Sequence, residues 1–104
     1  MTTQLTTETF AKSIQNGVSL IDFGAQWCPP CRMMEPVVEE LSQDFDGKAM
    51  IAQVDVDQSQ DLANLFGIRS IPTMVIFKDG KPVDALVGVH PKQTLMEKIQ
   101  AQLS

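Results

Sequence analysis

Two cysteines, Cys28 and Cys31, are the residues of this sequence best suited to covalent chemistry, and they lie in the segment Trp27-Cys28-Pro29-Pro30-Cys31. The 104-residue chain contains no other cysteine. Residues at i and i+3 can lie on one side of a first helical turn, where about 5–6 Å between Cα atoms permits a disulfide. The spacing therefore predicts a dithiol that opens and closes without moving the backbone.

The two sulfurs are expected to have different roles, because the motif lies where a predicted strand passes into a predicted helix. At the start of a helix, unpaired N–H groups and the dipole favour the thiolate over the thiol. Cys28 is therefore the predicted nucleophile, which attacks a substrate disulfide. Cys31 is the predicted resolving thiol, which attacks the mixed disulfide and releases the reduced product.

Two other interpretations of the cysteines stay open. One is an inert structural pair, and the other is a metal site. Tetrahedral zinc needs four ligands, whereas this chain offers two cysteines and a single histidine, His90. A monomer is short of ligands, so zinc or an iron–sulfur centre would have to be shared between two chains. We predict no metal and assign no role to His90.

Asp22 is the single charged residue in the apolar run from Val18 to Ala25. Desolvation should raise its pKa, and such a carboxyl could take a proton from Cys31 as that thiol attacks. The alternative is an aspartate on an edge strand, facing water.

The composition predicts one globular domain over residues 1–104, with 43% hydrophobic and 20% charged residues and no repeat or linker. A net charge of -5 disfavours nucleic acid and anionic lipid as partners. The first five residues lack the features of a secretory signal, and no window approaches a membrane span. We therefore expect a cytoplasmic protein with no membrane partner.

Hydrophobic periodicity predicts alternating strands and helices in the first two thirds of the chain. We expect an edge strand near Gln4-Leu5, a helix capped by Thr7, a doubly covered strand over 18–25 and a long helix from the motif to about Phe45. A strand over 49–56 and a short helix after Ser59 that carries Leu62, Leu65 and Phe66 should follow.

The sequence of the remaining third of the chain predicts a hairpin followed by a helix. Asp79-Gly80 lies between the apolar runs 73–77 and 82–87, which is a strong signal for a tight antiparallel turn. A last amphipathic helix from Pro91 should place Leu95, Met96, Ile99 and Leu103 on one side. This order of elements predicts an α/β fold in three layers with a mixed sheet.

Along essentially its whole length the sequence resembles the thioredoxin family. The residues that carry the resemblance are Asp22-Phe23, Trp27-Cys28-x-Pro30-Cys31, Pro36, Gly67-Ile68-Arg69, Ile71-Pro72-Thr73, Phe77-Lys78-Asp79-Gly80 and Val87-Gly88. The resemblance implies a thioredoxin fold, with a five-stranded mixed sheet in the order 1-3-2-4-5 flanked by four helices. It also implies a monomeric protein-disulfide reductase without a bound cofactor. Its electrons would come from NADPH through a flavin-dependent thioredoxin reductase and pass to disulfide-containing client proteins.

The resemblance also implies how the site is shaped. The Ile71-Pro72 bond should be cis, with the proline against the cysteines and Asp22 beneath Cys31. The residues expected to shape the site or bind substrate are Trp27, Pro29, Pro30, Val56, Ile71, Pro72, Gly88 and Val89.

Three positions depart from the family pattern. Pro29, Gly24 and Gln53 stand where the family usually has Gly, Trp and Lys. Gln53 cannot supply a positive charge, so proton release from Asp22 should be tuned differently. Two further functions stay open, namely a redox-capable interaction subunit in which the thiols are incidental, and an oxidant or isomerase.

Overall fold

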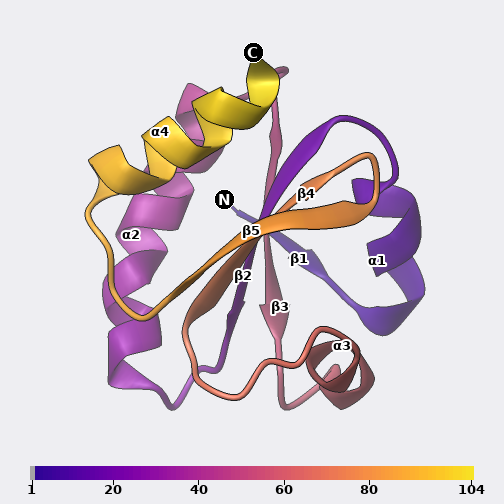
Figure 1. Ribbon diagram of the computed structural model, residues 1–104. Coiled ribbons are helices and arrows are strands. Elements are labelled where there is room, and N and C mark those ends of the chain that lie inside the picture. Colours follow the sequence, from indigo (N-terminus) through magenta and orange to yellow (C-terminus); the bar gives the residue numbers. More distant parts are fainter. Residues whose placement is uncertain (1) are drawn as a thin grey trace.

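The computed structural model describes residues 2–104, so the first residue of the predicted domain lies outside it. Within that range the chain forms five strands and four helices (Figure 1). In chain order these are β1 (Thr3–Leu5), α1 (Thr7–Ile14), β2 (Val18–Gly24), α2 (Pro29–Asp44), β3 (Met50–Asp55), α3 (Gln60–Leu65), β4 (Thr73–Lys78), β5 (Lys81–Val87) and α4 (Lys92–Leu103).

The strands form one mixed sheet in the order β1-β3-β2-β4-β5, which confirms the expected topology. β1 and β2 run parallel to β3, whereas β4 runs antiparallel to both β2 and β5. β2 is therefore the central strand, and it leads directly into the cysteine motif.

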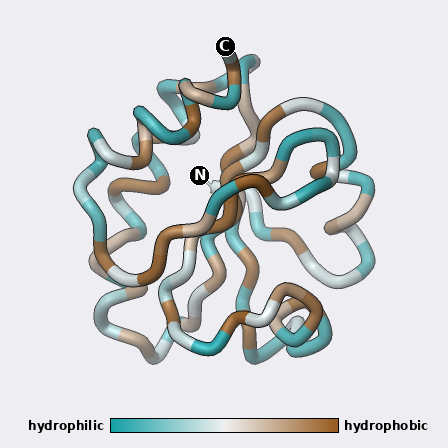
Figure 2. Tube along the Cα trace, viewed as in Figure 1, coloured by the Kyte–Doolittle hydropathy of each residue, from teal (hydrophilic) through white to brown (hydrophobic). Residues whose placement is uncertain are grey.

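Helices cover both faces of the sheet and make three layers (Figure 1). On one face Leu20 of β2 belongs to a core cluster with residues of α2 and α4, such as Val38 and Ile99. On the other face Ile21 clusters with residues of α1 and α3, such as Phe10. Hydrophobic residues accordingly concentrate along the central strands (Figure 2). Side chains alternate along a strand, so Asp22 lies on the face of Leu20, under α2.

The hairpin between β4 and β5 turns at Asp79 and Gly80, as predicted. Both residues have positive φ, 51° and 86°, which is the geometry of a two-residue type I′ turn. The Asp79 N–H donates to the Gly17 carbonyl (2.9 Å), and the Gly17 N–H donates to Asp79 Oδ1 (2.8 Å). These two hydrogen bonds hold the turn against the loop between α1 and β2.

Some details of the helices differ from the expectation. Thr6, not Thr7, caps α1, and its N–H donates to Thr9 Oγ1 (3.0 Å). Leu65 and Leu103 belong to the apolar patterns of α3 and α4 and are 72% and 40% exposed. Each is the last residue of its helix.

Among residues 2–104, no helix has the length and apolar character that crossing a bilayer requires.

Candidate active site

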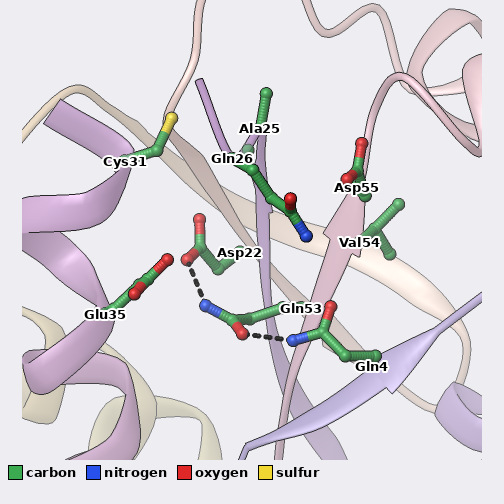
Figure 3. Close-up of a pocket in the computed structure, with 10 residues that line it drawn as sticks. Gln4, Asp22, Ala25, Gln26, Cys31, Glu35, Gln53, Val54 and Asp55 are labelled. Carbon is green, nitrogen blue, oxygen red and sulfur yellow. Dashed lines mark hydrogen bonds between the residues drawn. The ribbon is translucent and has the colours of Figure 1, made fainter. Parts of the chain in front are cut away.

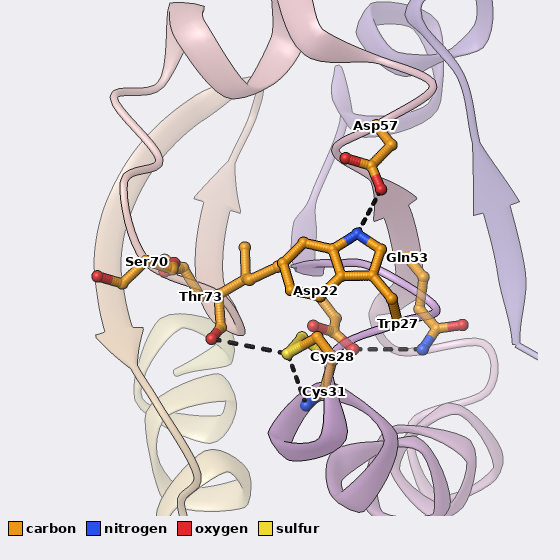
Figure 4. The surroundings of a disulfide bond; sticks show 9 residues. Asp22, Trp27, Cys28, Cys31, Gln53, Asp57, Ser70 and Thr73 are labelled. Atoms are coloured by element: carbon orange, nitrogen blue, oxygen red, sulfur yellow. Dashed lines mark hydrogen bonds between the residues drawn. A yellow bond between two sulfur atoms is a disulfide. The ribbon is translucent and has the colours of Figure 1, made fainter.

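Cys28 and Cys31 form a disulfide at the start of α2, as their spacing predicted (Figure 4). Their Cα atoms are 5.2 Å apart, and the two side chains are only 4% and 5% exposed. Cys28 is the N-cap residue of α2, and Cys31 lies in its first turn. The pair is therefore in its oxidised state, with one sulfur at the helix start.

One backbone donor of the helix start reaches the first sulfur. Pro29 and Pro30 occupy the first two helical positions and have no N–H. The next residue is Cys31, whose N–H donates to Cys28 Sγ (3.3 Å). The departure at Pro29 thus removes one donor and leaves this bond in place.

Two further loops lie near the disulfide, one containing Ile71 and Pro72 and the other containing Gly88 and Val89. The Ile71–Pro72 peptide bond is cis, and the Ile71 carbonyl oxygen lies 3.9 Å from Cys28 Sγ. The Pro72 carbonyl accepts from the Gly88 N–H (2.8 Å), and Gly88 has a φ of 89°. The loop that follows β5 is thereby held beside the proline, with Val89 49% exposed next to it.

A shallow groove of about 340 Å³ runs beside the disulfide and brings together three of the predicted residues, Trp27, Val56 and Ile71. Val56 and Ile71 also pack against the two cysteines. The groove continues along α3 past Ile68, which the sequence analysis did not select.

Trp27 is 69% exposed, yet its indole is fixed. Its Nε1 donates to Asp57 Oδ2 (2.6 Å; Figure 4). Sequence reasoning missed Asp57. It follows β3 just as Trp27 follows β2, and because these strands are parallel neighbours their carboxyl ends meet at one edge of the sheet. That relationship could have indicated the pair.

Asp22 is 3% exposed on the central strand, so the interpretation as an edge-strand residue is wrong. It lines a cavity of about 120 Å³ together with Gly24, Cys31, Glu35 and Gln53 (Figure 3). Gln53 Nε2 donates to Asp22 Oδ2 (3.2 Å), whereas Oδ1 has no hydrogen-bond partner in the structure.

Gly24 leaves space between this carboxyl and the second cysteine. A Cβ atom at Gly24 would lie 3.2 Å from Cys31 Sγ and 3.7 Å from Asp22 Oδ1. The two atoms therefore flank the same space. The cavity exceeds the roughly 30 Å³ that one water occupies in the liquid, so it can hold water.

The pKa of Asp22 is raised to about 6, chiefly by burial. The hydrogen bond from Gln53 lowers this pKa, and the negative charge of Glu35 adds to the rise. The predicted direction is confirmed. At pH 7 a carboxyl with this pKa is ionised in roughly nine molecules of ten, so it can accept a proton. Sequence reasoning missed Glu35, although it lies one helical turn after Cys31 and shares its face of α2.

Within residues 2–104, no group of three or more His, Cys, Asp or Glu side chains could hold a metal ion. His90 Nε2 lies 2.9 Å from the Val87 carbonyl oxygen, and His90 lines neither the groove at Trp27 nor the Asp22 cavity.

Comparison with known proteins gives one consistent result. The family model described as thioredoxin matches residues 1–101. A thioredoxin of Staphylococcus saprophyticus is 50% identical over 100 residues, which cover 96% of both chains. A thioredoxin of Staphylococcus aureus is 45% identical over the same share of both chains. The solved structure of a mutant thioredoxin from Halobacterium salinarum NRC-1 superposes with a TM-score of 0.91 at 38% identity, covering 98% of this chain and 90% of that one.

Proposed function

The chain belongs to the thioredoxin family and is a protein-disulfide oxidoreductase, and we propose that Cys28 is its nucleophile and Cys31 its resolving thiol. The observation that carries this division is the placement of the sulfurs. Cys28 Sγ caps the helix and accepts the Cys31 N–H, which stabilises a thiolate at that atom. Cys31 has its sulfur beside the Asp22 cavity instead.

In the first step the Cys28 thiolate attacks one sulfur of a client disulfide. A bond forms between Cys28 Sγ and that sulfur, the client disulfide breaks, and the other client sulfur leaves as a thiolate. The product is a mixed disulfide between Cys28 and the client.

In the second step the Cys31 thiol gives its proton to the Asp22 carboxylate, and its sulfur attacks Cys28 Sγ. The Cys28–Cys31 disulfide forms and the second client sulfur leaves as a thiolate. Two electrons have then passed from the dithiol to the client. Asp22 suits this role because it is buried, ionised at neutral pH and turned toward the space beside Cys31 Sγ.

The groove lined by Trp27, Val56 and Ile71 receives the client segment next to the reacting disulfide. Trp27, Val56, Ile68 and Ile71 give the groove apolar walls, and Gln60, Asn64 and Arg69 add polar groups along it. The Gly88 N–H donates to the Pro72 carbonyl, which joins the loop after β5 to the proline beside Ile71. An extended segment there would be held by backbone hydrogen bonds and apolar contacts, which demand little sequence specificity. Pro29 and Pro30 each have a fixed φ, so they stiffen the backbone at the start of α2.

The dithiol has to be regenerated after each turnover. We assign that step to a flavin-dependent thioredoxin reductase that takes electrons from NADPH, while this chain itself carries no cofactor. We also propose a cytoplasmic location, because a reductase of many client proteins needs a supply of reducing equivalents. The protein is proposed to act as a monomeric single domain.

The test is reduction of a disulfide-bonded protein such as insulin, with a chemical dithiol as reductant. We expect turnover by the parent and none by Cys28→Ser. A measured reduction potential near the thioredoxin value of about -270 mV supports a reductase, and a value above about -200 mV would assign the protein to the oxidants instead. A double Cys28→Ser, Cys31→Ser variant that kept the biological activity would favour the interaction-subunit function.

A further inference from the structure

A row of three polar side chains crosses the sheet at one level. Gln4 of β1 is paired with Gln53 of β3, and Gln53 is paired with Asp22 of β2. Directly paired residues of neighbouring strands point to the same face of a sheet. Gln4 is exposed, Gln53 half-buried and Asp22 buried, so the row leads from the edge of the sheet to the acid.

The hydrogen bonds along the row have a single consistent direction. An ionised carboxylate only accepts hydrogen bonds, so Gln53 must present its Nε2 to Asp22 Oδ2 (3.2 Å). The Oε1 of Gln53 then points the other way and needs a donor, which is Gln4 Nε2 (2.5 Å; Figure 3). Gln4 thereby fixes which end of the Gln53 amide faces the acid.

We propose that Gln4 is a positioning residue for the resolving step: through Gln53 it keeps Asp22 Oδ2 occupied and leaves Oδ1 as the oxygen that takes the proton from Cys31. The inference rests on the proposed role of Asp22. Oδ1 has no partner and borders the space beside Cys31 Sγ, so a proton placed there is on the reacting side of the carboxyl.

Without Gln4, the Gln53 amide can rotate and present Oε1, which would accept a hydrogen bond from the protonated acid. Removing the donor stabilises the protonated form relative to the ionised one. The titratable groups that line the Asp22 cavity with it are Glu35 on α2 and Asp55 at the end of β3, with Cys31 held in the disulfide, and none of these supplies a positive charge. Arg32 and Glu39 of α2 line a neighbouring groove with Gln4 and Gln53, which Asp22 does not line. The amide of Gln53 is thus the group that favours the ionised form.

The test follows Asp22 in the oxidised protein by NMR titration of its side-chain carboxyl carbon. In Gln4→Leu we expect its pKa to rise by about one unit, the lower end of the range for one lost hydrogen bond to a charged group. Gln53→Leu should raise it at least as much. In the Gln53→Leu background, Gln4→Leu should add nothing, because Gln4 acts through Gln53.

The matched control is Thr3→Val, a substitution on the same strand whose side chain lies on the opposite face. It should leave the pKa of Asp22 unchanged. In single turnover, the acid limb of the pH profile for the resolving step should move upward in Gln4→Leu by the same amount as the pKa. Isotope-edited infrared spectra below pH 5 should show the carbonyl stretch of protonated Asp22 moving to higher frequency in both glutamine variants, because Oδ2 loses its donor.

The proposal is overturned if the pKa of Asp22 is unchanged in Gln4→Leu. It is also overturned if adding Gln4→Leu to Gln53→Leu raises that pKa as much as Gln4→Leu does alone, or if Thr3→Val raises it by the same amount. An unchanged carbonyl stretch in Gln53→Leu would overturn the assignment of the proton to Oδ1. The titration needs no client protein, so a parent that fails to reduce disulfides would contradict the proposed function without altering the titration result.

Discussion

The backbone N–H of Cys31 points at Cys28 Sγ, 3.3 Å away. The residue proposed to resolve the mixed disulfide therefore also supplies a hydrogen bond to the proposed nucleophile. The donor is a backbone group, so replacing the Cys31 side chain removes the second thiol and keeps this bond. The two contributions of one residue can be separated by experiment.

Cys31→Ser should trap the mixed disulfide. Cys28 keeps its hydrogen bond and attacks the client, but no thiol remains to release it. Incubation with oxidised client protein should give a covalent adduct, visible in a non-reducing gel and located at Cys28 by mass spectrometry. Cys28→Ser, which keeps the other sulfur, should give no adduct. Adducts formed equally by both variants would contradict the assigned roles.

Asp22→Asn should stabilise the fold above pH 6. The folded pKa of about 6 exceeds the ordinary value of 3.8, so the folded state binds more protons than the unfolded state between these values. Stability is therefore lost as pH rises through this window and stays low above it. A shift of this size corresponds to about 3 kcal/mol, and an asparagine amide that lacks a full set of partners would reduce the gain. We expect urea unfolding to show a gain of about 1–3 kcal/mol at pH 8 that vanishes near pH 4. A variant less stable than the parent at pH 8 would refute the burial argument.

The same substitution should slow the resolving step. An asparagine cannot accept the Cys31 proton, so the second step must lose it to water. Stopped-flow measurement of mixed-disulfide decay at pH 7 should show a rate at least about tenfold lower, with little change in the rate of the first attack. An equal loss in both steps would show instead that Asp22 acts on the nucleophile.

Trp27→Ala should weaken the use of protein disulfides without unfolding the protein. The indole is 69% exposed, so its loss should change the free energy of unfolding by less than about 0.5 kcal/mol. It also lines the groove beside the disulfide, so kcat/KM for a protein client should fall about tenfold, mainly through KM. Leu65→Ala is the control, because Leu65 is 72% exposed and does not line that groove. A similar loss in the control would mean that any exposed apolar residue suffices.

Pro29→Gly should make the protein slightly more oxidising. Glycine restores one N–H at the first helical position, close to Cys28, and a better stabilised thiolate favours the dithiol. A change of half a pKa unit corresponds to about 15 mV for a two-electron couple. Titration against a glutathione buffer should show a rise of roughly 10–30 mV. An unchanged potential would show that this proline has no effect on the redox equilibrium.

The sequence predicted the succession of strands and helices and the cysteine pair because both follow from short-range patterns, whereas the strand order was implied by the resemblance to the thioredoxin family. Alternating apolar runs locate β2 and β3, and Asp79-Gly80 specifies a turn that only such residues adopt readily. The bond between Trp27 and Asp57 and the row through Gln53 depend on which strands become neighbours and on their register. Periodicity along one segment carries no information about register between segments.

The short edge strand β1 has a practical consequence for handling the protein. Gln4 lies in this strand, and its amide is two hydrogen bonds from the buried carboxyl. An affinity tag fused directly before this strand would sit next to the polar row, whereas the other end of the chain leaves from α4, which contributes no residue to the cavity around Asp22. Affinity tags, dyes and surface linkers should therefore be attached after α4 when proton transfer at Asp22 is to be measured.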